Sequence, residues 1–200
     1  MLDRYPDEEG LANWTAMLED GYSTSKLVSE FVSSDEFKAI CDSYGLTAGT
    51  IALTDRDVNG NITRFVERCY EYALERAADE DGLNLWCGHL LYGHVNENDE
   101  PYTPERVAFG FIFAPEAQDR NLDDTAFIEM LYRMMLDRAP DAGVSNWVAS
   151  LASLTEAEVA WAIASGERTA EEAKDLARQK TYASFAASEE FANMCANFGF

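Results

Sequence analysis

The 200-residue chain contains one short pattern three times, and this repetition limits its fold more than any other feature. The pattern reads LDRYPDEEGLANW at Leu2–Trp14 and LERAADEDGLNLW at Leu74–Trp86, and a copy one residue shorter, LDRAPDAGVSNW, stands at Leu136–Trp147. Repeats of this kind are typical of supersecondary units that stack and bury a core together. The chain is therefore expected to fold as a set of related units.

Amphipathic helices are predicted directly before the second and third copies. The segments are FVERCYEYAL at Phe65–Leu74 and FIEMLYRMML at Phe127–Leu136, with apolar residues at i, i+1, i+4, i+5, i+8 and i+9. This spacing places the apolar side chains on one helical stripe. Arg76 and Arg138 stand at the ends of these helices, where a cation opposes the negative end of the helix dipole. The pattern predicts an all-α fold of αα-hairpins.

Each copy also carries the residues of a tight joint between two helices. An Asp is placed to cap the second helix, and a Gly in its first turn leaves room for the preceding helix. A Trp one turn further on is placed to pin the hairpin through core packing. These residues are Asp7, Gly10 and Trp14 in the first copy, Asp79, Gly82 and Trp86 in the second, and Asp141, Gly143 and Trp147 in the third.

The copies set the expected domain boundaries. We expect a truncated first repeat at 1–50, a second repeat at 51–120 and a third repeat with a helical insert at 121–200, together forming one compact helical domain with a continuous core. The first copy lacks the helix that precedes the other two, so the chain is expected to be part of a longer multidomain protein. The apolar face that this leaves is expected to be covered by the C-terminal helix or by a second chain.

Caps and inserts complete the prediction of elements. Ser23, Ser34 and Ser188 are placed to cap further helices. The second copy has a polar insert, YGHVNENDEPYTP, and the third has a helix-forming insert around GERTAEEAKDLARQK. Repeat proteins often carry such insertions on a binding face.

The charge of the chain excludes several classes of partner. There are 37 acidic and 15 basic residues, which gives a net charge of −22. Such a surface repels nucleic acid and anionic lipid, and no cluster of Lys and Arg opposes that repulsion. It favours cations, basic partners and neutral glycans. No apolar run is long enough to cross a membrane, so no membrane insertion is expected.

The segment DRDVNGN is the best candidate for a metal site. Asp55, Asp57, Asn59 and Asn61 are spaced like the first ligands of an EF-hand calcium loop. The bidentate glutamate that should close such a loop is absent, since Val66 stands at that position. The alternative is an Asx and Gly turn that leads into a helix capped by Thr63. No other cofactor is expected.

The cysteines and histidines allow two further interpretations. Cys69 and Cys87 lie almost symmetrically about the second joint, so an antiparallel hairpin would bring them together as a disulfide. The alternative is that they are buried free thiols. His89 and His94 form C-x-H-x4-H with Cys87, which does not fit a standard zinc spacing.

Aromatic residues outside the repeated pattern are the candidates for ligand binding. Trp161 has no counterpart, since the first two copies were aligned with Ser29 and Phe109 at that position, and Tyr92 and Tyr102 flank the second insert. The alternative is that these rings pack within the core or the inserts. No carboxylate pair is placed for glycosidase chemistry, and no nucleophile signature is present, so no enzymatic activity is expected.

The repeat as a whole resembles a known bacterial family. The pattern F-V-x-x-x-Y-x-x-x-L-x-R, then P-D-x-x-G-L-x-x-W, then a closing F-x-x-S-x-E-F, is similar to the family catalogued as domain of unknown function 4214. It resembles more distantly the helical linker domain of phycobilisome linker proteins. Departures from the family pattern are Ala78 in place of proline, the residue missing from the third joint, and the third insert.

The resemblance implies an all-helical fold and a place outside the cell, on secreted or surface-attached bacterial proteins. It implies no catalytic residues. We therefore expect a non-catalytic recognition or adhesion module that binds a glycan or a surface protein. The alternative is a structural scaffold or oligomerisation module that acts through protein–protein interaction.

Overall fold

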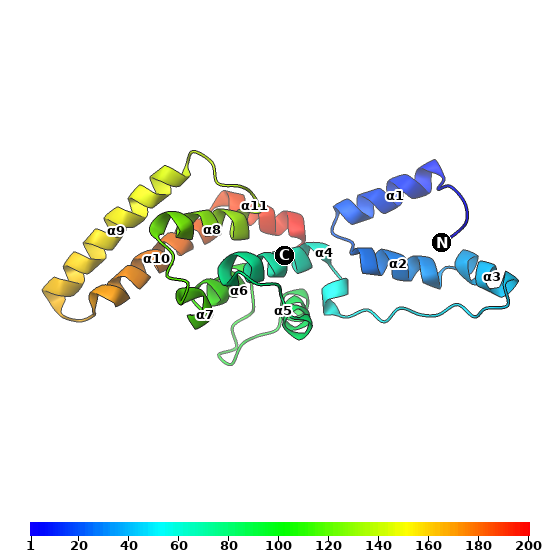
Figure 1. Cartoon of the computed structure of the whole chain (residues 1–200), viewed down its shortest axis with the longest axis horizontal. Helices are drawn as coiled ribbons and strands as arrows, with labels where there is room; N and C mark the ends of the chain where they lie inside the picture. The colour runs from blue at the N-terminus through cyan, green and yellow to red at the C-terminus, as the bar shows by residue number, and fades with distance from the viewer. The chain divides into compact units, whose positions relative to one another are not determined.

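The computed structural model describes residues 1–200 and is built from helices (Figure 1). The predicted all-α fold is confirmed. A short 3-10 helix, η1 (Asp55–Asp57), and a π-helix, η2 (Cys69–Ala73), accompany the α-helices. The α-helices are α1 (Glu8–Glu19), α2 (Thr24–Ser33), α3 (Asp35–Ser43), α4 (Gly60–Arg68), α5 (Glu80–Tyr92), α6 (Pro104–Ile112), α7 (Pro115–Gln118), α8 (Asp124–Leu136), α9 (Val144–Ser165), α10 (Ala170–Ala186) and α11 (Glu189–Phe198).

The chain divides into two compact units, and the three repeats stay a division predicted from the sequence pattern. The first unit contains residues 1–67, 78–103 and 197–200, and the second contains residues 68–77 and 104–196. Neither of the boundaries expected from the repeats, after residue 50 and after residue 120, coincides with a boundary between units. The reason is that helices of the middle repeat are shared: α5 packs with η1 in the first unit, whereas η2 packs with α6 and α8 in the second.

The aspartate caps are confirmed in two joints and corrected in the third. Asp7 Oδ1 accepts a hydrogen bond from Gly10 N at 2.7 Å, and Asp79 Oδ1 accepts one from Gly82 N at 2.8 Å, each at the N-cap of its helix. In the third joint, helix α9 begins after Gly143, and Asp141 Oδ1 accepts from the amide of that glycine. Asp141 therefore stands two residues before the N-cap of α9 instead of at it.

The glycine and tryptophan of the joint have more specific contacts than the sequence indicated. A Cβ on Gly143 would lie 2.8 Å from Asp141 Oδ1 and 3.1 Å from the Tyr132 hydroxyl, so this glycine makes room for the carboxylate and for the preceding helix. At Gly10, only Asp7 is that close. The tryptophans contact the helix that follows: Trp14 lies 5.1 Å from Phe31, and Trp147 lies 4.4 Å from Phe185, between ring centroids.

Helix α8 forms the centre of the second unit. It packs against η2, α9 and α10, which leaves little of its surface in contact with solvent. Its buried residues are Phe127, Ile128, Met130, Leu131, Tyr132, Met134 and Met135. The third insert does not form a separate helix. Instead it lengthens two neighbours into an antiparallel hairpin, α9 with 22 residues and α10 with 17, whereas α1 and α2 of the first copy have 12 and 10.

The helices of the first unit differ in how many of their side chains are buried. Helices α1, α2 and α3 contain no buried residue in the structure. In contrast, Phe65, Val66 and Cys87 are completely buried. Within this unit, the turn after α1 is bonded to the segment that leads into α4. Gly60 N donates to Gly21 O at 2.8 Å, and the Ser23 hydroxyl donates to the carbonyl of Asp57. The predicted caps Ser23, Ser34 and Ser188 are confirmed by their hydrogen bonds to backbone amides.

Candidate functional site

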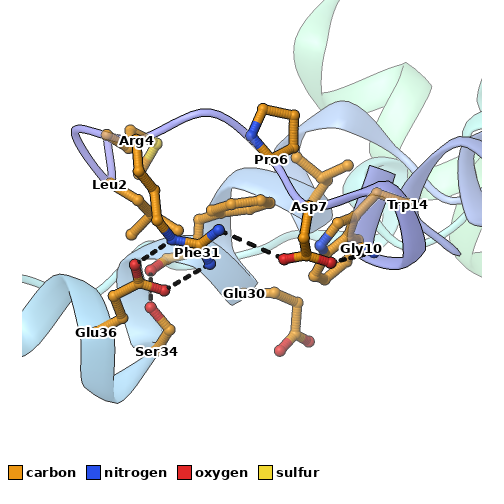
Figure 2. A pocket seen from close by; sticks show the side chains of 12 residues that line it. Leu2, Arg4, Pro6, Asp7, Gly10, Trp14, Glu30, Phe31, Ser34 and Glu36 are labelled. Carbon is orange, nitrogen blue, oxygen red and sulfur yellow. Dashed lines mark hydrogen bonds and ion pairs between the residues drawn. The ribbon is translucent and has the colours of Figure 1, made fainter. Parts of the chain in front are cut away.

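The first unit has an open groove in its first repeat. We call it the first-repeat groove; it has a volume of about 530 Å³ and lies between the N-terminal segment, α1, α2 and the start of α3 (Figure 2). Its lining is largely apolar and also includes charged side chains. The lining residues are Met1, Leu2, Arg4, Pro6, Asp7, Gly10, Trp14, Leu27, Glu30, Phe31, Ser34 and Glu36. The expected cover of this face by the C-terminal helix or by a second chain stays a prediction.

Arg4, Asp7 and Glu36 form a charged network in the lining of the groove (Figure 2). The Arg4 guanidinium group donates to both carboxylate oxygens of Glu36, at 2.5 Å and 3.0 Å, and to Asp7 Oδ2 at 3.4 Å. The amide of Gly10, and then Arg4, lower the pKa of the Asp7 carboxyl group. The hydrogen bond from Arg4 lowers the pKa of Glu36. Both carboxylates therefore stay ionised at neutral pH.

The same arginine fork recurs in the other two copies. Arg76 donates to Glu116 at 2.6 Å and 3.3 Å. Arg138 donates to both oxygens of Glu190 and to Asp141 Oδ2, the last at 2.9 Å. We interpreted these arginines in the sequence only as charges at helix ends. The recurrence of a glutamate five residues after a phenylalanine, in each closing segment, was the signal that would have revealed their partners.

The second insert gathers several aromatic rings in the first unit. The rings of His89 and Tyr102 stack with centroids 4.3 Å apart, and Trp86 lies edge-on to Tyr102 at 5.7 Å. The two histidine Nδ1 atoms, of His89 and His94, are 3.2 Å apart. Tyr92 lies 5.8 Å from the His94 ring and donates its hydroxyl to Asp55. The structure thus brings the predicted binding residues Tyr92 and Tyr102 into one cluster.

Trp161 does not belong to that cluster. It lies on α9 in the second unit, is 44% exposed, and has the Arg168 guanidinium group over its ring at 4.6 Å. Its alignment with Ser29 and Phe109 is wrong, since those residues lie on α2 and α6, the counterparts of α10. The lengthening of α9 by the insert explains the error.

The four predicted calcium ligands each have partners within the chain. Asp57 accepts from the amide and hydroxyl of Thr54, and Asp55 accepts from Tyr92. Asn59 Oδ1 accepts from the amides of Asn61 and Ile62 at the start of α4. That role replaces the predicted cap by Thr63, whose hydroxyl instead donates to the carbonyls of Arg56 and Asn59. Asn61 Oδ1 accepts from Arg64. No group of three or more His, Cys, Asp or Glu side chains is arranged to hold a metal ion.

The predicted disulfide is not formed in the structure, where all four cysteines are free thiols. Cys69 belongs to the second unit and Cys87 to the first, since the middle repeat is divided between the two. The Cys87 sulfur lies 3.7 Å from the Thr63 hydroxyl. Burial raises the pKa of Cys69 to about 12 and that of Cys87 to about 11. Neither thiol is therefore activated as a nucleophile.

The geometry and the repeat agree with the comparison to known families. The model of the family described as "Domain of unknown function (DUF4214)" matches residues 1–41 and 108–176, which is more than half of the chain. The chain belongs to this family. No curated protein and no solved structure matches it. No helix has both the length and the apolar character that crossing a membrane requires.

Proposed function

We propose that this chain is a non-catalytic recognition module of a secreted or cell-surface bacterial protein, and that it binds another polypeptide through the first-repeat groove. The observation that carries the proposal is the open apolar lining itself. Leu27, Phe31 and Trp14 are only half-buried, although they occupy positions of the hairpin core. Contiguous apolar surface of this kind, bordered by charge, is typical of protein interaction sites.

The chemistry of the groove supports binding rather than catalysis. Its acidic side chains include Asp7 and Glu36, whose pKa values are lowered by hydrogen bonds to Gly10 and Arg4. A general acid needs a raised pKa in an apolar setting, which these carboxylates lack. Their fixed charges instead provide polar contacts at the edge of an apolar interface.

A selection experiment tests this function. A library of displayed helical peptides of varied sequence is selected on the immobilised chain and counter-selected on a Leu27→Glu variant, which places a charge in the groove. We expect peptides that bind the parent chain and not the variant. The matched control is Leu11→Glu on α1, where the parent side chain is 54% exposed and outside the groove lining. If every recovered peptide binds all three proteins alike, the proposed function is wrong.

A second function, glycan binding, is favoured by the aromatic cluster of the second insert. Stacked and edge-on rings around Tyr102 and His89 offer flat faces of the kind that sugars contact. A glycan array with mucin-type and peptidoglycan sugars, run with and without calcium, tests it. Binding that is lost in Tyr102→Ala and retained in Trp161→Ala would assign the site to the insert. Silence across the array would contradict glycan binding and leave the groove as the recognition site.

The structural scaffold remains the alternative mode of protein interaction. Its distinguishing property is self-association through the groove. Sedimentation of the parent chain and of the Leu27→Glu variant distinguishes the scaffold from the recognition module. A scaffold of this kind forms an oligomer, and the variant does not.

A further inference from the structure

The C-terminal end of α5 brings the two histidines of the chain together. His89 lies in the last turn of this helix, and His94 is the second residue after it. On a continuous helix, residues five positions apart face different sides. Here the chain turns at Gly93, whose φ of +61° favours glycine, and the His94 amide donates to the His89 carbonyl at 3.2 Å. This turn leaves the Nδ1 atoms of the two rings 3.2 Å apart.

Contacts with other residues hold each histidine in place. The His89 ring stacks on Tyr102 with centroids 4.3 Å apart, and Trp86 lies edge-on to it at 5.6 Å. The Tyr102 amide donates to the His94 carbonyl at 2.9 Å, which fixes the backbone of His94 to the far end of the second insert. The pair is therefore positioned by α5 and by both ends of the insert.

The distance between the two nitrogens indicates what they can share. A neutral imidazole carries one N–H group and one nitrogen with a lone pair. Two such nitrogens 3.2 Å apart either share a proton in a hydrogen bond or direct both lone pairs at one metal ion. Two nitrogens bound to a tetrahedral ion at about 2.0–2.1 Å lie about 3.3–3.4 Å apart, and neighbouring ligands of an octahedral or square-planar ion at that bond length lie about 2.8–3.0 Å apart. The observed distance is closer to the tetrahedral value, which is the geometry of zinc.

The surroundings of the pair favour a cation. The sequence contains no Lys or Arg between Arg76 and Arg106, and the second insert carries the exposed carboxylates of Glu97, Asp99 and Glu100. The chain as a whole has a net charge of −22. Such a negative field raises the local concentration of divalent cations.

We propose that His89 and His94 bind a Zn²⁺ ion through their Nδ1 atoms, with water in the remaining positions. Each ring then keeps its proton on Nε2. Cys87 is not a third ligand, because it is completely buried and its sulfur lies 3.7 Å from the Thr63 hydroxyl. The site shares no residue with the first-repeat groove, so it stands independently of the proposed function.

The test is a calorimetric titration of the 200-residue chain with ZnCl2, after treatment with EDTA and dialysis. Excess MgCl2 in the buffer saturates diffuse binding to carboxylates. We expect one ion per chain, and binding about tenfold or more weaker in His94→Gln, which loses one of the two ligands. The matched control is Glu97→Gln, which removes a carboxylate of the same insert and should change the affinity by less than about twofold. Circular dichroism checks that both variants keep their helices.

Two spectroscopic measurements identify the ligands. In an NMR experiment that detects the imidazole nitrogens, Zn²⁺ should shift the Nδ1 resonances of His89 and His94 together and leave Nε2 protonated. Co²⁺ serves as an optical probe of the same site, because a thiolate ligand adds a charge-transfer band that nitrogen and oxygen ligands do not give. We expect the absorption of a tetrahedral ion without that band.

Four results would overturn the inference. These are the absence of saturable Zn²⁺ binding in MgCl2, an unchanged affinity in His94→Gln, a thiolate band with Co²⁺, and equal weakening in Glu97→Gln and His94→Gln. The second would leave the pair as a hydrogen bond between two imidazoles. The third would assign the ion to a cysteine, and the fourth would assign it to the carboxylates of the insert.

Discussion

At the scale of single residues, the side chains of each joint act through specific partners rather than through general helix properties. Asp7 and Asp79 each satisfy an amide of a helix start that would otherwise lack a partner. Arg76 and Arg138 each combine a forked ion pair with a cation over a tyrosine ring, a geometry that lysine does not reproduce. Outside the joints, burial shifts the pKa values of His89 and Cys69, and each shift gives a testable prediction.

His89 is expected to titrate below its ordinary pKa. Burial lowers its pKa, and the nearby charge of His94 lowers it further. Because the folded state then binds fewer protons than the unfolded state, stability is lost as the pH falls through about 6.5, the pKa of an unperturbed histidine. An NMR titration of the imidazole protons should show His89 below that value, and His94→Gln should raise it. A His89 pKa that is unchanged in His94→Gln would contradict the interaction.

The buried thiols are expected to resist alkylation in the native protein. Cys69 is completely buried and burial raises its pKa to about 12, so almost no thiolate is present at pH 8. Mass spectrometry after iodoacetamide treatment should find Cys69 unmodified in the native chain and modified in urea. Cys87 should react slowly for the same reason. A Cys69–Cys87 linked peptide in the non-reduced digest would instead restore the disulfide interpretation.

At the scale of elements, the same hairpin carries a buried core in one copy and an open face in another. The α9–α10 hairpin packs against α8, whereas neither α1 nor α2 has a buried residue. The energetic consequence is that equivalent core residues contribute unequally to stability, because the loss on truncation depends on burial.

Truncation of the equivalent phenylalanines measures that difference. Phe185→Ala should lower the free energy of unfolding by about 3–5 kcal/mol, since the side chain is 2% exposed. Phe31→Ala should lower it by about 1–2 kcal/mol, because Phe31 is only half-buried. Urea unfolding followed by circular dichroism gives both values. Equal losses at the two positions would show that the α1–α2 hairpin is covered in solution.

At the scale of the whole molecule, the excess of acidic residues dominates the electrostatics. The net charge of −22 gives long-range repulsion among carboxylates, which opposes the compact state. The exposed ion pairs of the joints are few by comparison and each contributes little. Screening of these charges by salt should therefore raise the free energy of unfolding of the chain.

A salt titration tests this balance. Raising NaCl from about 20 mM to about 500 mM should increase Tm by a few degrees, on the order of 1 kcal/mol for a chain of this length. CaCl2 at matched ionic strength is the control for a specific calcium site at Asp55 and Asp57. A further increase with calcium, lost in Asp57→Asn, would support the EF-hand interpretation. A fall in Tm with NaCl would show that the ion pairs outweigh the repulsion.

The sequence by itself determined the helical character of the chain and its local signals. Apolar spacing predicted α8 and a helical segment before the second joint, which the structure divides into the end of α4 and the π-helix η2. The caps Asp7, Asp79, Ser23, Ser34 and Ser188 were identified because capping depends on residues three positions apart. The family was identified for the same reason, since its pattern is local and repeated.

Only the tertiary structure decided which distant residues meet. The pairing of Arg4 with Glu36 joins residues far apart in the chain. The stacking of Tyr102 on His89 depends on how the second insert folds back on α5, and Cys69 and Cys87 belong to different units. Such contacts depend on how helices pack and on where an insert lengthens them. The sequence predicted an apolar face on the first repeat, and the structure showed which side chains line a groove there, because Leu2, Trp14 and Phe31 come from three separate segments.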